Sequence, residues 1–275
     1  LSKPFPAYWW DGRQNFGDLT TMAVLNWLGA RYVINVRRSS TNHGPALVGA
    51  GSILQDLNYP WGVVWGSGFI TDDLVGLGSA PVEPLCVLAL RGPYSWDIAR
   101  MLGWEAPELF CDPGLLISMM YPVRPKRYEV GFVPHYWHAA AVCNHRFSDD
   151  VKLIDVSQTV QTVAEELSAC RTVISTSLHG IVAAHAFGIP WVWAKMEPSL
   201  IGDGFKFHDF MDGMGIKAEP THISPEDIGK ERLLRLAKNA RLPEGASVLR
   251  KQRELLQALY DWDVVERLSR VGQQT

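Results

Sequence analysis

Cysteine is scarce in this sequence. Four cysteines stand among the 275 residues, and none forms a CxxC pair: Cys86, Cys111, Cys143 and Cys170. A chain of this length needs no disulfide framework to fold, so we expect reduced thiols and a cytoplasmic location. Metal-ligand spacing is also lacking, since His135 and His138 have no third ligand at a recognisable distance. We therefore expect no metal.

Long apolar runs and an excess of basic charge are missing as well. No uncharged stretch approaches the ~20 residues of a membrane-spanning helix, and no signal peptide is evident, so we expect a soluble protein, at most peripheral at a membrane. The net charge is −3, which gives no basic field of the kind that nucleic-acid binders use. Any anionic ligand must be bound by local charges.

Tryptophan is abundant by contrast, with eleven residues. Several of them flank turns rich in glycine or histidine rather than apolar segments: Trp9, Trp10, Trp61, Trp65 and Trp137. Aromatic rings suit the faces of sugars, although burial of a large side chain explains most tryptophans equally well.

The most informative stretch runs from Cys170 to Trp193. Val173 and Ile174 predict a buried strand, Ser175–Ser177 a polar turn, and Leu178–Phe187 a helix that Gly188 and Pro190 end. His179 falls in the first helical turn, where unpaired N–H groups and the positive end of the helix dipole meet hydroxyls and an imidazole. The pattern predicts an anion site with a proton carrier, or a core strand–helix–strand unit with an ordinary polar cap.

Similar strand-then-turn units fill the first half of the chain. The sequence predicts short strands at 46–48 and 63–65, each followed by a glycine-rich turn. It also predicts a helix at 19–28. Asp18 either caps this helix or belongs to a turn that faces a cleft. Together they favour a doubly wound parallel sheet. A third strand, 87–90, leads into Arg91, whose planar fork fits a carboxylate or phosphate but also pairs readily with an aspartate.

The second half repeats this organisation after a proline-rich, basic linker at 118–127. Strands are expected at 128–134 and 151–156, with an amphipathic helix at 159–169. Four glycines in 196–215 predict a mobile loop that covers a ligand, with Lys206 and His208 as its contacts. Amphipathic helices at 225–238 and 247–270 close the chain.

Eight segments, in this order, resemble the polysaccharide pyruvyltransferase family, and especially its xanthan-type ketal pyruvyltransferase branch. They are NFGD (15–18), GAGSIL (49–54), VWGSGF (64–69), LRGPYS (90–95), DPGLL (112–116), VPHY (133–136), VISTSLHGIVAAHAFGIP (173–190) and FKFHDF (205–210). The resemblance implies an α/β fold of two Rossmann-like domains facing a cleft, similar to two-domain glycosyltransferases of the GT-B kind. We place these domains at 1–120 and 121–275.

The resemblance also implies a reaction. A bacterial enzyme of this family would move the pyruvyl group of phosphoenolpyruvate, without a cofactor, onto two hydroxyls of one sugar in an exopolysaccharide or lipid-linked oligosaccharide. The family's functional histidine falls on His179 and its strand-end arginine on Arg91. Other branches have an arginine two residues before that histidine, where this chain has Ser177, so we expect Lys206 to supply the missing cation.

These considerations give three groups of candidate residues. The catalytic candidates are His179, His135 and Asp112; the donor-binding candidates are Arg91, Ser175, Thr176, Ser177, Leu178, Gly180 and Lys206; the cleft or acceptor candidates are Asn15, Asp18, Gly51, Ser52, Trp65, Tyr136 and His208. His179 is either the general acid or a phosphate anchor. Alternatives for the whole chain are a nucleotide-sugar glycosyltransferase of the same fold and a glycan-binding subunit without activity.

Overall fold

The computed structural model describes residues 4–74, 80–143, 145, 147–242 and 244–262. Its strands form two five-stranded sheets in which every pair of neighbours is parallel, with orders β2-β1-β3-β4-β5 and β10-β9-β8-β6-β7. The first sheet contains β1 (Phe5–Tyr8), β2 (Val33–Asn35), β3 (Ala46–Val48), β4 (Gly62–Trp65) and β5 (Cys86–Ala89). The second contains β6 (Tyr128–Val133), β7 (Val151–Leu153), β8 (Cys170–Ser175), β9 (Trp191–Lys195) and β10 (Thr221–His222).

Helices connect the strands, as parallel neighbours require. The α-helices are α1 (Phe16–Trp27), α2 (Pro93–Met101), α3 (Ile117–Met120), α4 (Ala139–Val142), α5 (Val160–Ser168), α6 (Leu178–Ala186), α7 (Phe205–Gly213), α8 (Lys230–Ala237) and α9 (Gly245–Asp261). Short 3₁₀ turns are η1 (Leu54–Asp56), η3 (Pro113–Leu116) and η4 (Pro225–Asp227). The predicted α/β class with two Rossmann-like sheets is confirmed.

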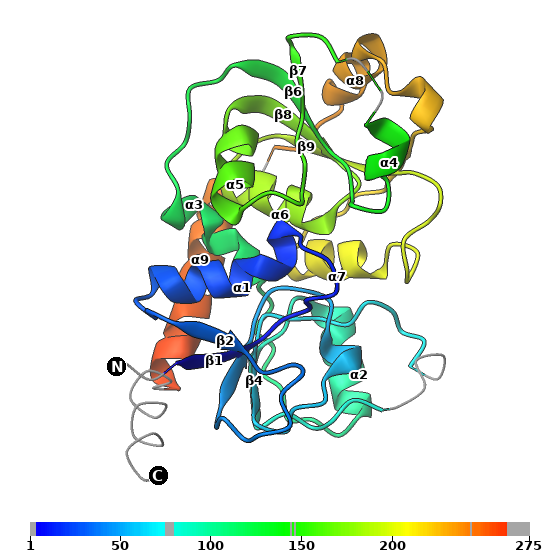
Figure 1. The fold of residues 1–275 in the computed structure, drawn as a ribbon. Coiled ribbons are helices and arrows are strands. Elements are labelled where there is room, and N and C mark those ends of the chain that lie inside the picture. The colour runs from blue at the N-terminus through cyan, green and yellow to red at the C-terminus, as the bar shows by residue number, and fades with distance from the viewer. Residues whose placement is uncertain (1–3, 75–79, 144, 146, 243, 263–275) are drawn as a thin grey trace.

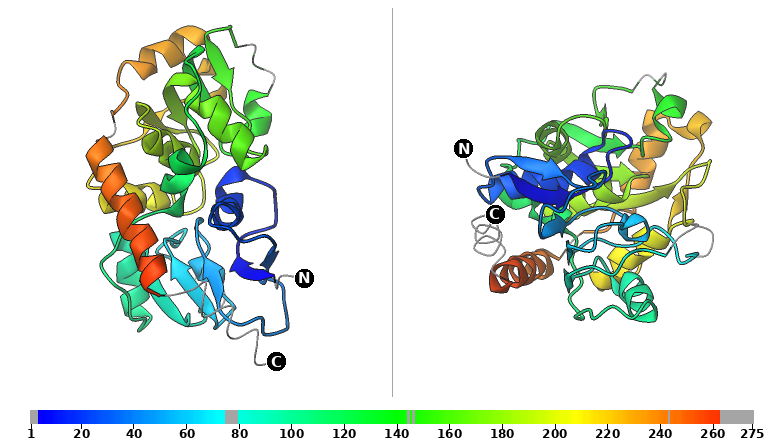
Figure 2. Two further views of the ribbon diagram at one scale, coloured as in Figure 1. Left: turned by 90° about the vertical axis from the view of Figure 1, so that its left-hand side faces the viewer. Right: turned by 60° about the horizontal axis from the view of Figure 1, so that its bottom comes forward.

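The two sheets lie one above the other in Figure 1, with α1 and α7 between them. The C-terminal helix α9 runs along one side of the molecule (Figure 2). There it packs on the first half of the chain, because the backbone carbonyls of Leu255 and Lys251 accept hydrogen bonds from Trp65 and Cys111. The domain boundary near residue 120 stays a prediction, and residues 263–270 of the predicted last helix lie outside the described residues.

Helix α6 is the best-buried helix of the second half. Ile181, Val182, Ala183 and Ala184 are almost fully inaccessible to water, which is expected of a helix that is apolar on all sides. It begins at the carboxyl end of β8, the central strand of its sheet. The first turn of α6 therefore lies at the edge where open parallel sheets bind their ligands.

The structure corrects three predictions about helix boundaries. Asn15, rather than Asp18, caps α1, since its extended backbone lets Oδ1 accept the N–H of Asp18 at 3.1 Å. Residues 205–213 form α7, so the predicted loop at 196–215 is reduced to residues 196–204 and 214–215. The linker at 118–127 is irregular only after α3, which ends at Met120.

No helix in the described part of the chain is both long and apolar enough to span a membrane.

Candidate functional site

A cavity of about 530 Å³ opens between the two halves of the molecule. The first half contributes residues of α1, of the turn before it and of the segments after β3 and β4. The second half contributes the segments after β6 and β7, the start of α6, the β9–α7 connection and the first turn of α7. The lining residues are Trp10, Arg13, Asn15, Asp18, Ser52, Ile53, Gln55, Asp56, Ile70, His135, Tyr136, Trp137, Val156, Ser177, Leu178, His179, Leu200, Ile201 and Lys206. This volume suits a small-molecule ligand.

The start of α6 faces this cavity through Ser177, Leu178 and His179. Ser175 holds the turn in place, because its Oγ accepts the N–H of Ser177 at 2.9 Å and also lies 2.9 Å from the carbonyl oxygen of Val133. The side chain of Ser177 makes no capping hydrogen bond, which corrects the expectation that the hydroxyls cap the helix. The first-turn N–H groups of α6 are thus available to an anion.

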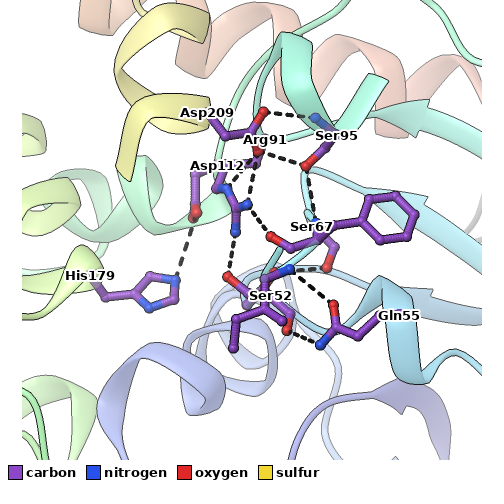
Figure 3. A network of polar contacts seen from close by, with 11 residues as sticks. Ser52, Gln55, Ser67, Arg91, Ser95, Asp112, His179 and Asp209 are labelled. Carbon is purple, nitrogen blue, oxygen red and sulfur yellow. Dashed lines mark hydrogen bonds and ion pairs between the residues drawn. The ribbon is translucent and has the colours of Figure 1, made fainter. Parts of the chain in front are cut away.

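His179, which lines the cavity, forms a pair with Asp112 (Figure 3). Nε2 of His179 lies 3.7 Å from Oδ2 of Asp112, and both atoms are buried with no hydrogen-bond partner among the described residues. The other oxygen of Asp112 accepts the N–H of Gly114 at 2.7 Å, which fixes the carboxylate. Burial lowers the pKa of His179, and the charge of Asp112 opposes that shift.

Gly17 of α1 lies against the other side of the imidazole ring of His179. A Cβ atom built on Gly17 would stand 2.1 Å from Nδ1 of His179, which is far inside van der Waals contact. Only glycine therefore lets helix α1 approach the ring this closely.

Lys206 brings a positive charge into the cavity from the first turn of α7. Its side chain is buried, and no hydrogen bond or ion pair of Lys206 occurs within the described part of the chain. Burial lowers the pKa of Lys206 to about 8; the charge of Arg91 acts in the same direction and that of Asp18 against it. Its Nζ lies 5.8 Å from the centre of the Phe207 ring. A desolvated ammonium that makes no hydrogen bond or ion pair in this part of the chain is well suited to bind an anionic ligand.

Asp18 lies in the first turn of α1 and also lines the cavity. The side-chain amide of Asn15 donates a hydrogen bond to one of its oxygens. Burial raises the pKa of Asp18 to about 6, against the effects of Asn15, Lys206 and Arg37. This carboxyl group can therefore gain or lose a proton near neutral pH.

Arg91 forms a buried ion pair with Asp209. Of the two predicted roles of Arg91, ligand binding or pairing with an aspartate, the structure shows the pairing. Nε and Nη2 both lie 2.9 Å from Oδ2 of Asp209, and Ser95 donates two further hydrogen bonds to the same carboxylate. The remaining guanidinium contacts are with Ser52 Oγ and the carbonyl oxygen of Phe69 (Figure 3). Arg91 lies behind Ser52 and is not among the lining residues.

Aromatic side chains surround the mouth of the cavity. His135 and Tyr136 have ring centroids 4.2 Å apart, Trp10 stacks on Tyr136 at 6.1 Å, and Arg13 lies 5.2 Å from the centre of the tyrosine ring. Trp137 is 42% exposed at the rim. Burial, helped by the charge of Lys206, lowers the pKa of His135 to about 2, so this imidazole is neutral and a weak base.

Several predicted site residues do not line the cavity. Trp65 is fully buried beneath α9 and donates its indole N–H to Leu255, which corrects its assignment to the cleft. His208 packs edge-on against Trp193 instead. The other predicted site residues outside the lining are Asp112, Arg91, Ser175, Thr176, Gly180 and Gly51.

Sequence reasoning missed other lining residues, among them Arg13, Gln55, Ile70, Leu200 and Ile201. None stands in a pattern that indicates a site, because each is brought to the cavity by the packing of the two halves. In the described residues no cluster of three His, Cys, Asp or Glu side chains could hold a metal ion. The expectation that no metal or cofactor is needed stays a prediction.

Comparison with known proteins gives two kinds of similarity. A family model described as polysaccharide pyruvyl transferase matches residues 63–194. An uncharacterized protein of Acanthamoeba polyphaga mimivirus is 33% identical over 216 residues, which is 74% of this chain and 72% of that protein. The succinoglycan biosynthesis protein ExoV of Rhizobium meliloti (strain 1021) is 27% identical over 235 residues, 79% of this chain and 67% of that protein.

The matched region contains both members of the buried pair, Asp112 and His179, together with Arg91 and His135. It runs from β4 of the first sheet to β9 of the second, and so includes walls of the cavity from both halves. The chain belongs to the polysaccharide pyruvyl transferase family.

Proposed function

We propose that this transferase moves the pyruvyl group of phosphoenolpyruvate onto two hydroxyls of one sugar. The acceptor would be an exopolysaccharide or its lipid-linked precursor, and the reaction would run in the bacterial cytoplasm, at the inner face of the membrane. The observation that carries the proposal is Lys206: a buried ammonium with no hydrogen bond or ion pair in the described chain, in one cavity with the start of α6 and with His179, the partner of Asp112.

The phosphate and the carboxylate of phosphoenolpyruvate need positively charged groups and hydrogen-bond donors in the cavity. Lys206 and the N–H groups of α6 supply a cation and a helix N-terminus for phosphate or carboxylate. Ser52 supplies a hydroxyl that lines the cavity and whose oxygen accepts a hydrogen bond from Arg91. Lys206 would thus replace the cation that other family branches place where Ser177 stands.

The first chemical step needs a proton on the donor's methylene carbon. A hydroxyl oxygen of the sugar attacks C2 of the enol while C3 takes the proton and becomes a methyl group. We assign this proton to His179. The bound donor's negative charge raises the pKa of a nearby imidazole, and the Asp112 carboxylate at 3.7 Å stabilises the imidazolium.

The attacking hydroxyl must lose its own proton to a base. Asp18, with its pKa raised to about 6, fits this role better than the two bases that the sequence suggested. The pKa of His135 is too low for proton abstraction at neutral pH, and Asp112 is engaged with Gly114 and His179.

The second step completes the ketal. The tetrahedral adduct expels phosphate, the second hydroxyl of the sugar adds to the same carbon, and its proton leaves with phosphate. Summed over both steps, phosphoenolpyruvate and a diol give a cyclic pyruvate ketal and inorganic phosphate. The aromatic rim would hold the sugar, since rings such as Trp137 present flat apolar surfaces. The similarity to a succinoglycan biosynthesis protein supports a glycan acceptor.

Isothermal titration tests the donor directly. Phosphoenolpyruvate should bind the wild-type protein, and Lys206→Ala should weaken that binding. A nucleotide sugar serves as the competing ligand, because a glycosyltransferase of the same fold would bind it instead. Binding of the nucleotide sugar together with no heat from phosphoenolpyruvate would reject the proposal.

A further inference from the structure

His138 is a buried histidine that the proposed chemistry does not use. It stands between β6 and α4, is 1% exposed, and does not line the large cavity. Its ring makes two hydrogen-bonding contacts: Nδ1 lies 2.8 Å from Oγ1 of Thr176, and Nε2 lies 3.0 Å from the carbonyl oxygen of Pro198. The ring thus joins two segments that are 22 residues apart in the sequence.

The partners fix the direction of each hydrogen bond. The Pro198 carbonyl only accepts, so Nε2 carries the hydrogen and Nδ1 of the neutral ring is an acceptor. Burial lowers the pKa of His138, which keeps the ring neutral. The Thr176 hydroxyl therefore donates to Nδ1, while its oxygen accepts the backbone N–H of His135 at 2.8 Å. One continuous chain of hydrogen bonds runs from His135 to Pro198.

Both segments that the His138 ring joins adjoin a wall of the cavity. Thr176 belongs to the turn that begins α6, three residues before His179. Pro198 belongs to residues 196–204, the connection between β9 and α7. This connection places Leu200 and Ile201 in the cavity wall and leads directly into Lys206.

The far end of the connection is held by the first half of the molecule. A Cβ atom on Gly202 would stand 2.0 Å from the carbonyl oxygen of Ile70, so the two backbones are in direct contact. Asp203 forms an ion pair with Lys195, which closes the connection back onto β9. At the near end, Ser199 bonds locally to the Glu197 side chain, and His138 Nε2 ties Pro198 to a residue outside the connection.

We propose that His138 is a positioning residue that sets the distance between the start of α6 and the 196–204 connection. It acts through Thr176 on one side and Pro198 on the other. His179 follows the first segment in α6 and Lys206 follows the second in the first turn of α7, so His138 fixes the spacing of the donor site without touching the donor. The identification of the donor as phosphoenolpyruvate rests on the function proposed above. The role of His138 in anchoring residues 196–204 does not depend on it.

Two measurements on the full chain test this role. Hydrogen–deuterium exchange reports how firmly residues 196–204 are held, and steady-state kinetics report the KM for phosphoenolpyruvate and kcat. In His138→Ala, amide exchange in 196–204 should accelerate by about tenfold, the equivalent of one lost hydrogen bond. The KM for phosphoenolpyruvate should rise by a similar factor, with a smaller change in kcat.

Rescue and control variants separate positioning from general destabilisation. His138→Gln retains one amide donor and one carbonyl acceptor, so it should restore slow exchange and a low KM in large part. Thr176→Val breaks the chain at the other end and should resemble His138→Ala, while Thr176→Ser should not. His185→Ala is the control, because it removes another buried imidazole. In the described chain the His185 ring accepts a hydrogen bond from the Trp191 indole N–H. This variant should leave exchange in 196–204 unchanged.

The outcomes are distinct. Wild-type exchange in 196–204 in His138→Ala, or equal acceleration in His185→Ala, would overturn the positioning role. If His138→Ala does not fold, the comparison of Thr176→Val with Thr176→Ser decides in the same way. If exchange in 196–204 is faster in His138→Ala but the wild-type protein does not turn over phosphoenolpyruvate, the anchoring role of His138 stands and phosphoenolpyruvate is rejected as the donor.

Discussion

Nε2 of His179 faces Oδ2 of Asp112 across 3.7 Å of buried space, and neither atom has another polar partner among the described residues. A buried carboxylate at this distance stabilises the imidazole ring only in its protonated, positively charged form. Burial, helped by the charges of Lys206 and Arg91, holds the pKa of His179 down. Binding of a multiply charged anion should therefore bring a proton with it.

The first prediction is proton uptake on donor binding. Because the pKa of His179 rises in the complex, affinity for phosphoenolpyruvate should be highest at low pH and fall as pH rises through the raised pKa, at most tenfold per unit. Titration calorimetry in buffers of different ionisation heats measures the proton directly. Asp112→Asn keeps the acceptor for Gly114 but removes the charge, so uptake should shrink in this variant. Equal uptake in both proteins would contradict the role of the pair.

A second prediction concerns Gly17. Alanine is the better helix former by ~1 kcal/mol, yet its Cβ would collide with the imidazole of His179. Gly17→Ala should fold with nearly unchanged stability while kcat falls by ~10²-fold, the lower end of what a displaced acid costs. Thermal unfolding and initial rates measure the two effects.

Gly245 provides the control for this substitution, since it also lies in a helix but has open space where a Cβ would stand. Gly245→Ala should leave the rate unchanged. Full activity in Gly17→Ala would mean that the ring's position against α1 is unimportant.

Lys206 carries the third prediction. Its removal leaves the donor's anionic group without a charge-assisted hydrogen bond, a loss of about 1.5–3 kcal/mol. Lys206→Ala should therefore raise the KM for phosphoenolpyruvate by roughly ten- to hundredfold, with little effect on the KM for the sugar. Lys217→Ala, an exposed lysine paired with Asp212, is the matched control. A larger effect on the sugar than on the donor would move Lys206 out of the donor site.

The fourth prediction addresses the Arg91–Asp209 pair. Removing one member of a buried pair leaves an uncompensated charge and typically costs about 3–5 kcal/mol. Asp209→Ala should lower the free energy of unfolding accordingly in urea titrations. The double variant Arg91→Met with Asp209→Leu removes both charges and should recover much of that loss. Arg91→Lys should raise the KM for the donor, because Ser52 loses a directed partner.

Stability that does not differ between the single and double variants would show that the pair is not a structural unit. An unchanged donor KM in Arg91→Lys would separate Ser52 from donor binding.

Local signals were sufficient for the central unit of the second sheet. The apolar strand, the hydroxyl turn and the Gly188–Pro190 stop predicted α6 within one residue of its observed end. The same reasoning failed for α7. That helix begins after Gly204 in a left-handed conformation rather than after a capping side chain, and it buries Lys206 and Asp209. Its sequence therefore lacks both a standard cap and an amphipathic pattern.

Distant contacts account for the remaining differences. The strand-end position of Arg91 was predictable, but its partner Asp209 stands 118 residues later. Trp65 is covered by α9 through a contact over 190 residues. Such pairings depend on how the two halves and the last helix pack, and no local periodicity encodes them.

Product analysis tests the central claim most directly. The protein is incubated with phosphoenolpyruvate and a panel of galactosides, glucosides and mannosides, and the mixture is examined by ¹H and ³¹P NMR. The account predicts a new ketal methyl singlet with one inorganic phosphate released per ketal, and neither signal with His179→Ala. Consumption of a nucleotide sugar by the wild-type protein, with no ketal and no phosphate from phosphoenolpyruvate on any acceptor, would contradict it.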